Sequence, residues 1–171
     1  MTLKLPPFES SGANLDSRFN LDGIVVHTAR RDLAWQSYAQ LFRNGGIEAV
    51  GPNFIDEDRR LLGRRLDAML IRGVAAYQRL WEILGVTGPI VAAPTLSEMK
   101  GVLMRAGPRY VFEPADPYTT DVVNVPEVVI QDAATPAPQA LKPLLDIVWN
   151  GGGWPGSPSY DEKTGEWTPP R

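Results

Sequence analysis

One long amphipathic segment, residues 56–84, limits what this chain can fold into more than any other part of the sequence. Its apolar residues recur at intervals of three and four, the spacing that puts side chains on one face of an α-helix. They are Leu62, Leu66, Met69, Leu70, Gly73, Tyr77, Leu80, Trp81 and Leu84. The acidic start DEDRR suits the positive end of a helix dipole, and Gly85 is suited to end the helix. We therefore predict one helix from about Asp56 to Leu84, with Gly73 allowing close approach to a strand.

The segments before this helix predict an antiparallel sheet. Residues 19–28 (FNLDGIVVHT) and 34–43 (AWQSYAQLFR) have the composition of strands, with residues 22–23 bending the start of the first. Residues 44–46 (NGG) are a hairpin signal that leads into a third short strand. Residues 1–18 are rich in Pro, Ser, Gly and Asn, and we expect an extended leader there. The first third is thus expected to form a three-stranded meander.

Shorter elements are expected after the long helix. Residues 90–104 predict two short extended pieces, and RYVFEP and VPEVVIQD predict two more strands. Residues 140–149 (ALKPLLDIVW) predict a short helix that ends at the glycines 151–153. Pro143 suits only the first turn of a helix, so this helix is expected to begin late.

These elements together predict an α+β fold. We expect a mostly antiparallel sheet packed by one long helix, with a short C-terminal helix and an aromatic-rich tail. A length of 171 residues is enough for one domain with its own core, which we place at residues 19–171 after the leader at 1–18.

Composition excludes several classes of function. The net charge of −3 gives no overall basic surface for nucleic acid, so any such site has to be a local patch. There is no cysteine, which excludes disulfides, thiolate metal sites and cysteine nucleophiles. No run is long and apolar enough for a membrane span, and the start MTLKLPPFESS does not resemble a signal peptide. We expect a soluble, cytoplasmic protein with no membrane partner.

The sequence contains no catalytic, metal or cofactor motif. His27 is the only histidine and lies in an apolar strand, so a structural histidine is the favoured interpretation. The alternative is a hydrolase that uses His27 with a carboxylate, although neither Ser37 nor Ser97 lies in a G-x-S-x-G setting. The glycines 151–153 follow a helix, whereas phosphate loops precede one. Two acidic groups are explained by helix capping at 56–58 and by a solvated turn at 161–162.

Arginines give the long helix a second pattern. Arg65, Arg72 and Arg79 are seven residues apart and therefore share one flank, with Arg64 beside them near the start. Such a stripe can follow a phosphate backbone. A solvated helix edge with local pairing to Asp58 and Glu82 is the other interpretation, and it is the one we favour.

The C-terminal tail offers a candidate site rich in glycine and tryptophan. Residues 143–170 contain several acidic side chains and no arginine, which disfavours stacking on nucleic-acid bases. Large aromatic residues in a Gly/Pro segment can instead hold irregular backbone onto a core. We predict that Trp149 and Trp154 are largely buried. Asn150, Trp154, His27 and Arg43 are the residues that we consider for a ligand pocket.

Four segments carry a family resemblance: RFNLDGIVVHT, YAQLFRNGGIEAV, VPEVVIQD and LKPLLDIVWNGGGWPGSPSYDEKTGEW. Together they resemble the region that follows the AlbA-like domain in bacterial Schlafen-type DNA-binding and transcription-regulator-like proteins. The shared patterns are R-x-N-x-D-G, Q-[LV]-F-R-x-G-x-I-E-A-V, P-E-V-V-I and a final W-N-x-x-G-x-x-x-S. The resemblance covers nearly the whole chain and is weak between residues 108 and 121.

The resemblance implies a companion domain and no catalytic residue. In that family DNA binding belongs to the AlbA-like domain, and no stretch of this chain resembles that domain. We therefore expect a non-enzymatic accessory or regulatory domain that binds a protein partner, such as an AlbA-like domain, or a small ligand. The alternatives are nucleic-acid binding by the arginine stripe and hydrolysis by His27.

Overall fold

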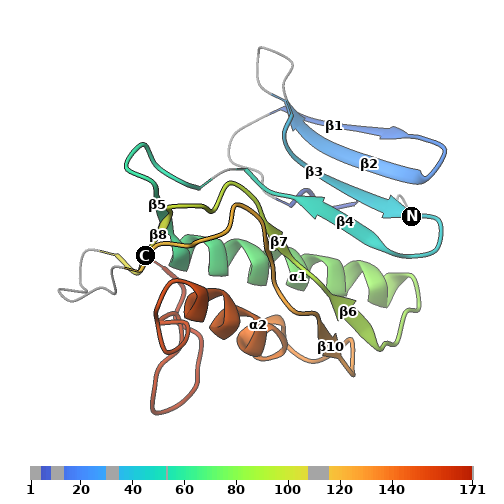
Figure 1. The fold of residues 1–171 in the computed structure, drawn as a ribbon. Coiled ribbons are helices and arrows are strands. Elements are labelled where there is room, and N and C mark those ends of the chain that lie inside the picture. Colours follow the sequence, from blue (N-terminus) through green and yellow to red (C-terminus); the bar gives the residue numbers. More distant parts are fainter. Residues whose placement is uncertain (1–4, 9–13, 30–34, 53, 108–115, 171) are drawn as a thin grey trace. The chain divides into compact units, whose positions relative to one another are not determined.

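A computed structural model describes residues 5–8, 14–29, 35–52, 54–107 and 116–170 of the chain (Figure 1). The mixed helices and strands confirm the α+β class. Contacts group the chain into two compact units, each of which is considered by itself. Unit 1 is Met1–Asn53 with Arg72–Val86, and unit 2 is Phe54–Ile71 with Thr87–Arg171. The expected domain boundary at residue 19 stays a prediction.

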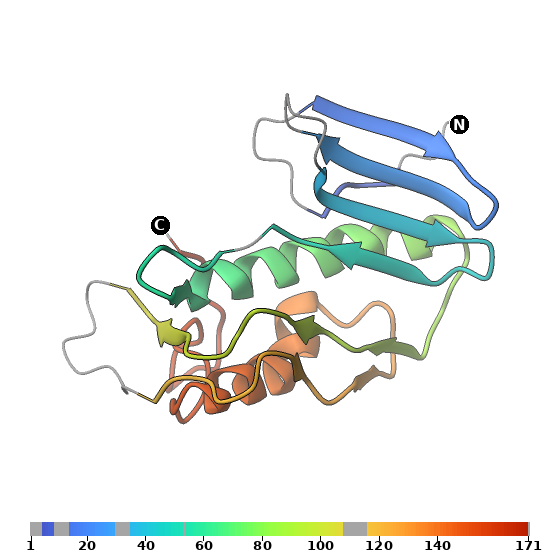
Figure 2. The ribbon, with the colours of Figure 1, turned by 45° about the horizontal axis from the view of Figure 1, so that its top comes forward.

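Unit 1 is built on a four-stranded antiparallel sheet in the order β1-β2-β3-β4 (Figures 1 and 2). The strands are β1 (Asn14–Phe19), β2 (Gly23–Ala29), β3 (Trp35–Phe42) and β4 (Ile47–Val50). The predicted three-stranded meander is confirmed as β2, β3 and β4. The predicted hairpin at residues 44–46 is also confirmed, because the N–H of Phe42 donates to the carbonyl of Gly46 at 2.9 Å.

Strand β1 is an addition to the predicted meander, since residues 14–18 were expected in the leader. It pairs with β2 along its whole length, with Ser17 beside Val26. A turn separates the two strands where the sequence predicted only a bend. The side-chain oxygen of Asn20 accepts the N–H groups of Asp22 and Gly23 at 3.1 and 2.8 Å. This local bonding competes with a continuous strand and reverses the chain.

The core of unit 1 lies between this sheet and the second half of helix α1 (Gly63–Ile83). Its buried members are Leu5, Val26, Ala39, Leu41, Tyr77 and Leu80. Leu5 thus belongs to the core although it was expected in the leader. The ring of Phe8 stacks on Tyr77 with centroids 6.4 Å apart. The predicted close approach of a strand at Gly73 is wrong: the position is tightly packed, but its neighbour is the ring of Phe8, which a Cβ would meet at 2.6 Å.

Helix α1 begins at Gly63, seven residues later than predicted. Oδ1 of Asp56 accepts the N–H groups of Asp58 and Arg60 at 3.0 and 2.8 Å, so the acidic run shapes a turn instead of capping a helix. Strand β5 (Arg60–Leu62) follows this turn and gains ladder hydrogen bonds by parallel pairing with β8 (Leu103–Arg105). Those bonds, and the burial of Leu61, explain why the residues before Gly63 are not helical.

The end of helix α1 is close to its prediction. Gly85 has a φ of 71°, and the N–H of Val86 donates to the carbonyl of Trp81 at 2.8 Å. This left-handed glycine with a backward hydrogen bond is a common way to end a helix. The predicted role of Gly85 as the C-terminal cap is confirmed.

The described residues of unit 2 form three two-stranded pairings. The strands after β5 are β6 (Ile90–Ala92), β7 (Thr95–Leu96), β8 (Leu103–Arg105), β9 (Val123–Asn124) and β10 (Val128–Ile130). β5 pairs with β8 in parallel, while β6 with β10 and β7 with β9 are antiparallel. The strand predicted from VPEVVIQD is confirmed as β10. The strand predicted from RYVFEP lies outside the described residues.

Helix α2 (Ala137–Gly151) begins earlier than predicted and contains Pro143 in its interior. An internal proline costs a helix about 3 kcal/mol because it removes one hydrogen bond and crowds the preceding turn. Here the proline lies on the exposed side, while Leu144 and Leu145 beside it are fully buried. Burying such side chains contributes about 1.5–3 kcal/mol each, which offsets the cost.

Candidate functional site

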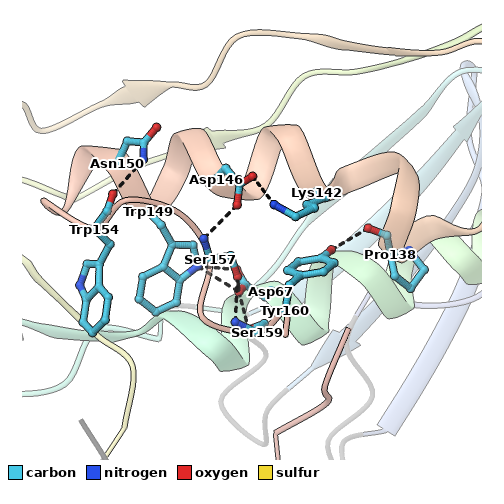
Figure 3. Close-up of polar contacts among 10 residues, drawn as sticks. All are labelled: Asp67, Pro138, Lys142, Asp146, Trp149, Asn150, Trp154, Ser157, Ser159 and Tyr160. Atoms are coloured by element: carbon cyan, nitrogen blue, oxygen red, sulfur yellow. Dashed lines mark hydrogen bonds and ion pairs between the residues drawn. The ribbon is translucent and has the colours of Figure 1, made fainter. Parts of the chain in front are cut away.

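Asp67 lies in the first half of helix α1 and is fully buried, which is rare for a carboxylate. Its Oδ2 accepts hydrogen bonds of 2.6 Å from the hydroxyl groups of Ser157 and Ser159. The indole Nε1 of Trp149 donates to both carboxylate oxygens at 3.0 Å. We call these four residues the Asp67 cluster (Figure 3). The cluster joins helix α1 to helix α2 and to the segment that follows α2.

A glycine makes room for this contact. A Cβ on Gly63 would lie 2.4 Å from Cζ2 of Trp149 and 2.5 Å from Sδ of Met104. Because Gly63 has no side chain, the indole lies against the first turn of α1. It can then reach Asp67, which is one helical turn further along the same face.

The predicted end of helix α2 at the glycines is confirmed. The N–H groups of Gly152 and Trp154 both donate to the carbonyl of Trp149, at 3.0 and 3.1 Å. The two indoles then meet edge to face, with centroids 5.3 Å apart. Trp149 is 0% exposed and Trp154 is 8% exposed, so the prediction that both are buried is confirmed. The Asn150 amide donates to the carbonyl of Trp154 at 2.8 Å and closes the turn.

A second set of contacts holds the same segment to helix α2. The carboxylate of Asp146 accepts the backbone N–H of Ser157 at 2.9 Å and pairs with Lys142 at 2.6 Å (Figure 3). The Lys142 ammonium also lies 5.3 Å from the ring centre of Tyr160. The Tyr160 hydroxyl donates to the carbonyl of Pro138 at 2.6 Å. These contacts order the irregular backbone after α2.

The electrostatics of Asp67 are those of a carboxylate removed from water. Burial raises the pKa of Asp67 above its ordinary value of 3.8. Hydrogen bonds from Ser157, Ser159 and Trp149 oppose this rise, as does the positive charge of Arg64. The raised pKa means that the loss of hydration outweighs the donors that replace it.

The arrangement suits a structural connection better than acid–base chemistry. A serine nucleophile needs a base that takes its proton and an open path to a substrate. Ser159 is fully buried and Ser157 is nearly so, and both hydroxyls donate to the same carboxylate oxygen. The Asp67 cluster therefore fixes the C-terminal segment to helix α1.

Asp67 is not among the site residues predicted above, although the sequence contains a signal for it. Three of its four neighbours on the helix surface, Gly63, Leu70 and Ile71, are non-polar, and the fourth is Arg64. A lone carboxylate in such a surrounding has to be buried with hydrogen-bond partners, since an unpaired charge there is too costly. The partners themselves are 82 to 92 residues away in the chain and cannot be found from spacing.

His27 lies in β2 and is buried, in agreement with a structural histidine. Its Nε2 is 3.7 Å from Oδ2 of Asp16, its neighbour on β1. Ser37 is in register with Thr28 and bonds its hydroxyl at 2.9 Å. Because neighbouring residues of a strand point to opposite faces, Ser37 and His27 lie on opposite sides of the sheet. Ser97 is exposed and belongs to unit 2.

Arg43 is exposed, and its Nε donates to the carbonyl of Leu21 at 2.9 Å. It shares unit 1 with His27, whereas Asn150 and Trp154 belong to unit 2. A ligand-binding role for these four residues stays a prediction.

The arginines of helix α1 differ in their surroundings. Arg64 donates to the carbonyl of Thr168 at 2.9 Å, which ties the end of the chain to the helix. The guanidinium of Arg65 lies 4.9 Å from the ring centre of Phe54. Arg72 and Arg79 are exposed.

Two acidic groups have structural roles. Asp58, in the turn before β5, pairs at 2.8 Å with Arg60, the first residue of that strand, rather than with the arginine stripe. The solvated turn predicted at residues 161–162 is confirmed, since Oδ1 of Asp161 accepts the N–H groups of Lys163 and Thr164 at 2.9 and 2.8 Å.

In the described parts of the chain, no group of three or more His, Asp or Glu side chains is placed to hold a metal ion. Neither described helix is both long and apolar enough to cross a bilayer.

Comparisons with known proteins give no significant match to a family model, to a curated protein or to a solved structure.

Proposed function

We propose that this chain is a non-enzymatic accessory or regulatory domain that binds a protein partner in a bacterial Schlafen-type, DNA-binding or transcription-regulator-like system. The observation that carries the proposal is the internal use of its reactive groups. The buried carboxylate of Asp67 accepts hydrogen bonds from Trp149 and from the hydroxyls of Ser157 and Ser159, all in its own chain. A segment that looked like a ligand loop is thus used to complete the fold.

A protein partner fits this arrangement better than a small ligand does. Asn150 donates to Trp154, and the indole Nε1 of Trp154 donates to the carbonyl of Met104 at 3.3 Å. These polar groups, which would orient a small ligand, are satisfied within the chain. The partner that we propose is an AlbA-like domain, and this choice depends on the family resemblance of the sequence.

The proposal is tested by titrating the chain with a purified AlbA-like domain of a bacterial Schlafen-type protein in a calorimeter. We expect saturable one-to-one binding, and an unrelated acidic domain of similar size is the control. The absence of binding would remove the AlbA-like partner. A separate hydrolase screen would overturn the non-enzymatic proposal if it found turnover that the His27→Ala variant loses.

A second candidate function is nucleic-acid binding by helix α1. It is favoured by the exposure of Arg65, Arg72 and Arg79 on one helix. The logarithm of the binding constant for a DNA or RNA duplex should then fall linearly with the logarithm of the salt concentration. The triple Arg→Ala variant should lose affinity, while Lys163→Ala in the distant exposed turn should not. Equal affinity of the triple variant and the wild type would remove this candidate.

A further inference from the structure

Strand β1 forms one edge of the unit 1 sheet (Figure 2). Within the described residues it pairs only with β2. Two large apolar side chains of this strand are exposed, Leu15 at 53% and Phe19 at 84%. An edge strand with exposed apolar side chains is a template for pairing with another strand.

The backbone of β1 directs hydrogen-bonding groups away from β2 at three positions. The N–H of Asn20 donates to the carbonyl of Gly23 at 3.0 Å, which continues the β1–β2 register. In an antiparallel ladder every second residue bonds to the same neighbour. The even-numbered residues of β1 therefore bond to β2, and Leu15, Ser17 and Phe19 direct their N–H and C=O groups outward.

The N–H of Ser17 agrees with this assignment. It donates to Oδ1 of the preceding residue, Asp16, at 2.8 Å. A ladder N–H would already have a partner on β2, so the side-chain bond identifies Ser17 as an outward position. Asp16 itself is 73% exposed at its side chain and can change partner.

The sequence of β1 is complementary to itself about Ser17. Leu15 and Phe19 lie two residues to either side, and Asp16 and Arg18 lie one residue to either side. We propose that β1 pairs antiparallel with β1 of a second copy of this chain, with Ser17 opposite Ser17. Leu15 then faces Phe19 of the second copy, and Asp16 faces Arg18. The two four-stranded sheets join into one sheet of eight strands.

The side chains select this register among those that the backbone permits. A shift by two residues keeps the outward groups of Ser17 paired, but it sets Asp16 opposite Asp16 or Arg18 opposite Arg18. Like charges directly opposite each other destabilise a strand pair, while opposite charges stabilise it by about 0.2–1 kcal/mol. An unrelated peptide strand would satisfy the backbone equally well, but a second copy also supplies both complementary pairs. The proposal concerns self-association and does not depend on the protein partner proposed above.

Sedimentation velocity of the full chain over a wide range of concentrations tests the proposal. We expect a reversible monomer–dimer equilibrium of modest affinity, because a single strand edge buries little area. Wild-type chain that stays monomeric at every concentration would overturn the proposal.

Charge reversal gives a sharper test of the register. Asp16→Arg places Arg opposite Arg in the symmetric pair, and Arg18→Asp places Asp opposite Asp. Each variant alone should therefore associate less than the wild type, and an equimolar mixture of the two should form a heterodimer with both charge pairs restored. A mixture that associates no better than its components would overturn the register.

Ser17→Pro supplies the check against misfolding. An edge position whose N–H points outward tolerates proline, so this variant should keep its circular dichroism spectrum and lose the dimer. An unfolded Ser17→Pro chain would mean that the N–H of Ser17 belongs to the β1–β2 ladder, which overturns the proposal. A folded variant that still dimerises would place the interface elsewhere, with the same consequence.

Discussion

The hydroxyl of Ser159 donates a 2.6 Å hydrogen bond to the carboxylate of Asp67, which lies 92 residues earlier in the chain. Both residues are fully buried. A bond of this kind replaces water around a charged group and has no solvent to substitute for it when it is lost. The irregular segment after helix α2 is therefore part of the fold of unit 2 and not a free tail.

The first prediction concerns this bond directly. Ser159→Ala should lower the free energy of unfolding by about 1.5–3 kcal/mol, the usual range for a lost hydrogen bond to a charged group. Chemical denaturation at neutral pH measures the change. Ser97→Ala, at an exposed serine of the same unit, should stay within about 0.5 kcal/mol of the wild type. Equal losses in the two variants would contradict a special role for Ser159.

The second prediction is that Asp67 gives the stability a pH dependence opposite to that of most carboxylates. Because burial raises the pKa of Asp67 above 3.8, the folded protein holds this proton more tightly than the unfolded chain does. The contribution of Asp67 is therefore greatest below pH 3.8. It falls as the pH rises through the folded pKa, and it is level above that value.

Unfolding of the wild type and of Asp67→Asn across this pH range measures the effect. The difference in free energy of unfolding, wild type minus variant, should fall as the pH rises from 3.8. The contrast is Asp161, whose pKa is lowered by the N–H groups of Thr164 and Lys163. For Asp161→Asn the difference should instead decrease as the pH falls below 3.8. If the two differences changed in the same direction with pH, the raised pKa of Asp67 would be contradicted.

Local sequence signals predicted the parts of this fold that depend on neighbouring residues. The hairpin at residues 44–46, the cap at Gly85 and the turn at residues 161–162 need only particular residues at particular offsets. The burial of Trp149 and Trp154 followed from the size of the indole and from the Gly/Pro-rich segment around it. These features require no knowledge of distant partners.

The start of helix α1 shows where local signals fail. An acidic run before an apolar periodic segment looks the same whether it caps a helix or forms a turn before a strand. The outcome depended on β8, some 40 residues later, which supplies ladder hydrogen bonds to residues 60–62. The role of Asp67 was not predicted for the same reason, because its donors Ser157 and Ser159 lie about 90 residues later in the chain.

The third prediction uses the close packing at Gly63. Alanine is favoured over glycine by about 1 kcal/mol in a helix interior and by less at Gly63, the first residue of α1, so propensity alone predicts that Gly63→Ala stabilises slightly. Its Cβ would instead meet Trp149 at 2.4 Å and Met104 at 2.5 Å, and both are almost fully buried. We expect a loss of about 1–3 kcal/mol from overpacking, measured by chemical denaturation.

Gly46→Ala is the matched control for this change. The nearest atom to a new Cβ there is Oδ1 of Asn44 at 3.2 Å, the end of an exposed side chain that also accepts the N–H of Gly46 at 3.0 Å. We expect only a small effect there. A Gly63→Ala chain as stable as the wild type would mean that the indole of Trp149 can move away from α1.

The fourth prediction is that Trp149 and Ser159 are energetically coupled through Asp67. Trp149→Phe removes the indole donor, and Ser159→Ala removes one hydroxyl donor, from the same carboxylate. Each loss raises the folded pKa of Asp67 further, because fewer donors then support its charge. Once Asp67 is protonated in the folded state, the remaining donor bonds to a neutral group, so its removal costs less free energy of unfolding.

A double-mutant cycle at neutral pH measures this coupling. The double variant should be destabilised by less than the sum of the two single changes, with an interaction energy of about 0.5–3 kcal/mol. Ser97→Ala combined with Trp149→Phe provides the control and should be additive, since Ser97 is not a member of the Asp67 cluster. The coupling should shrink below pH 3.8, where Asp67 is neutral in every variant and the removal of one donor no longer changes its charge. Additivity at neutral pH would mean that the two donors act on Asp67 independently, and that Asp67 keeps its charge when one of them is lost.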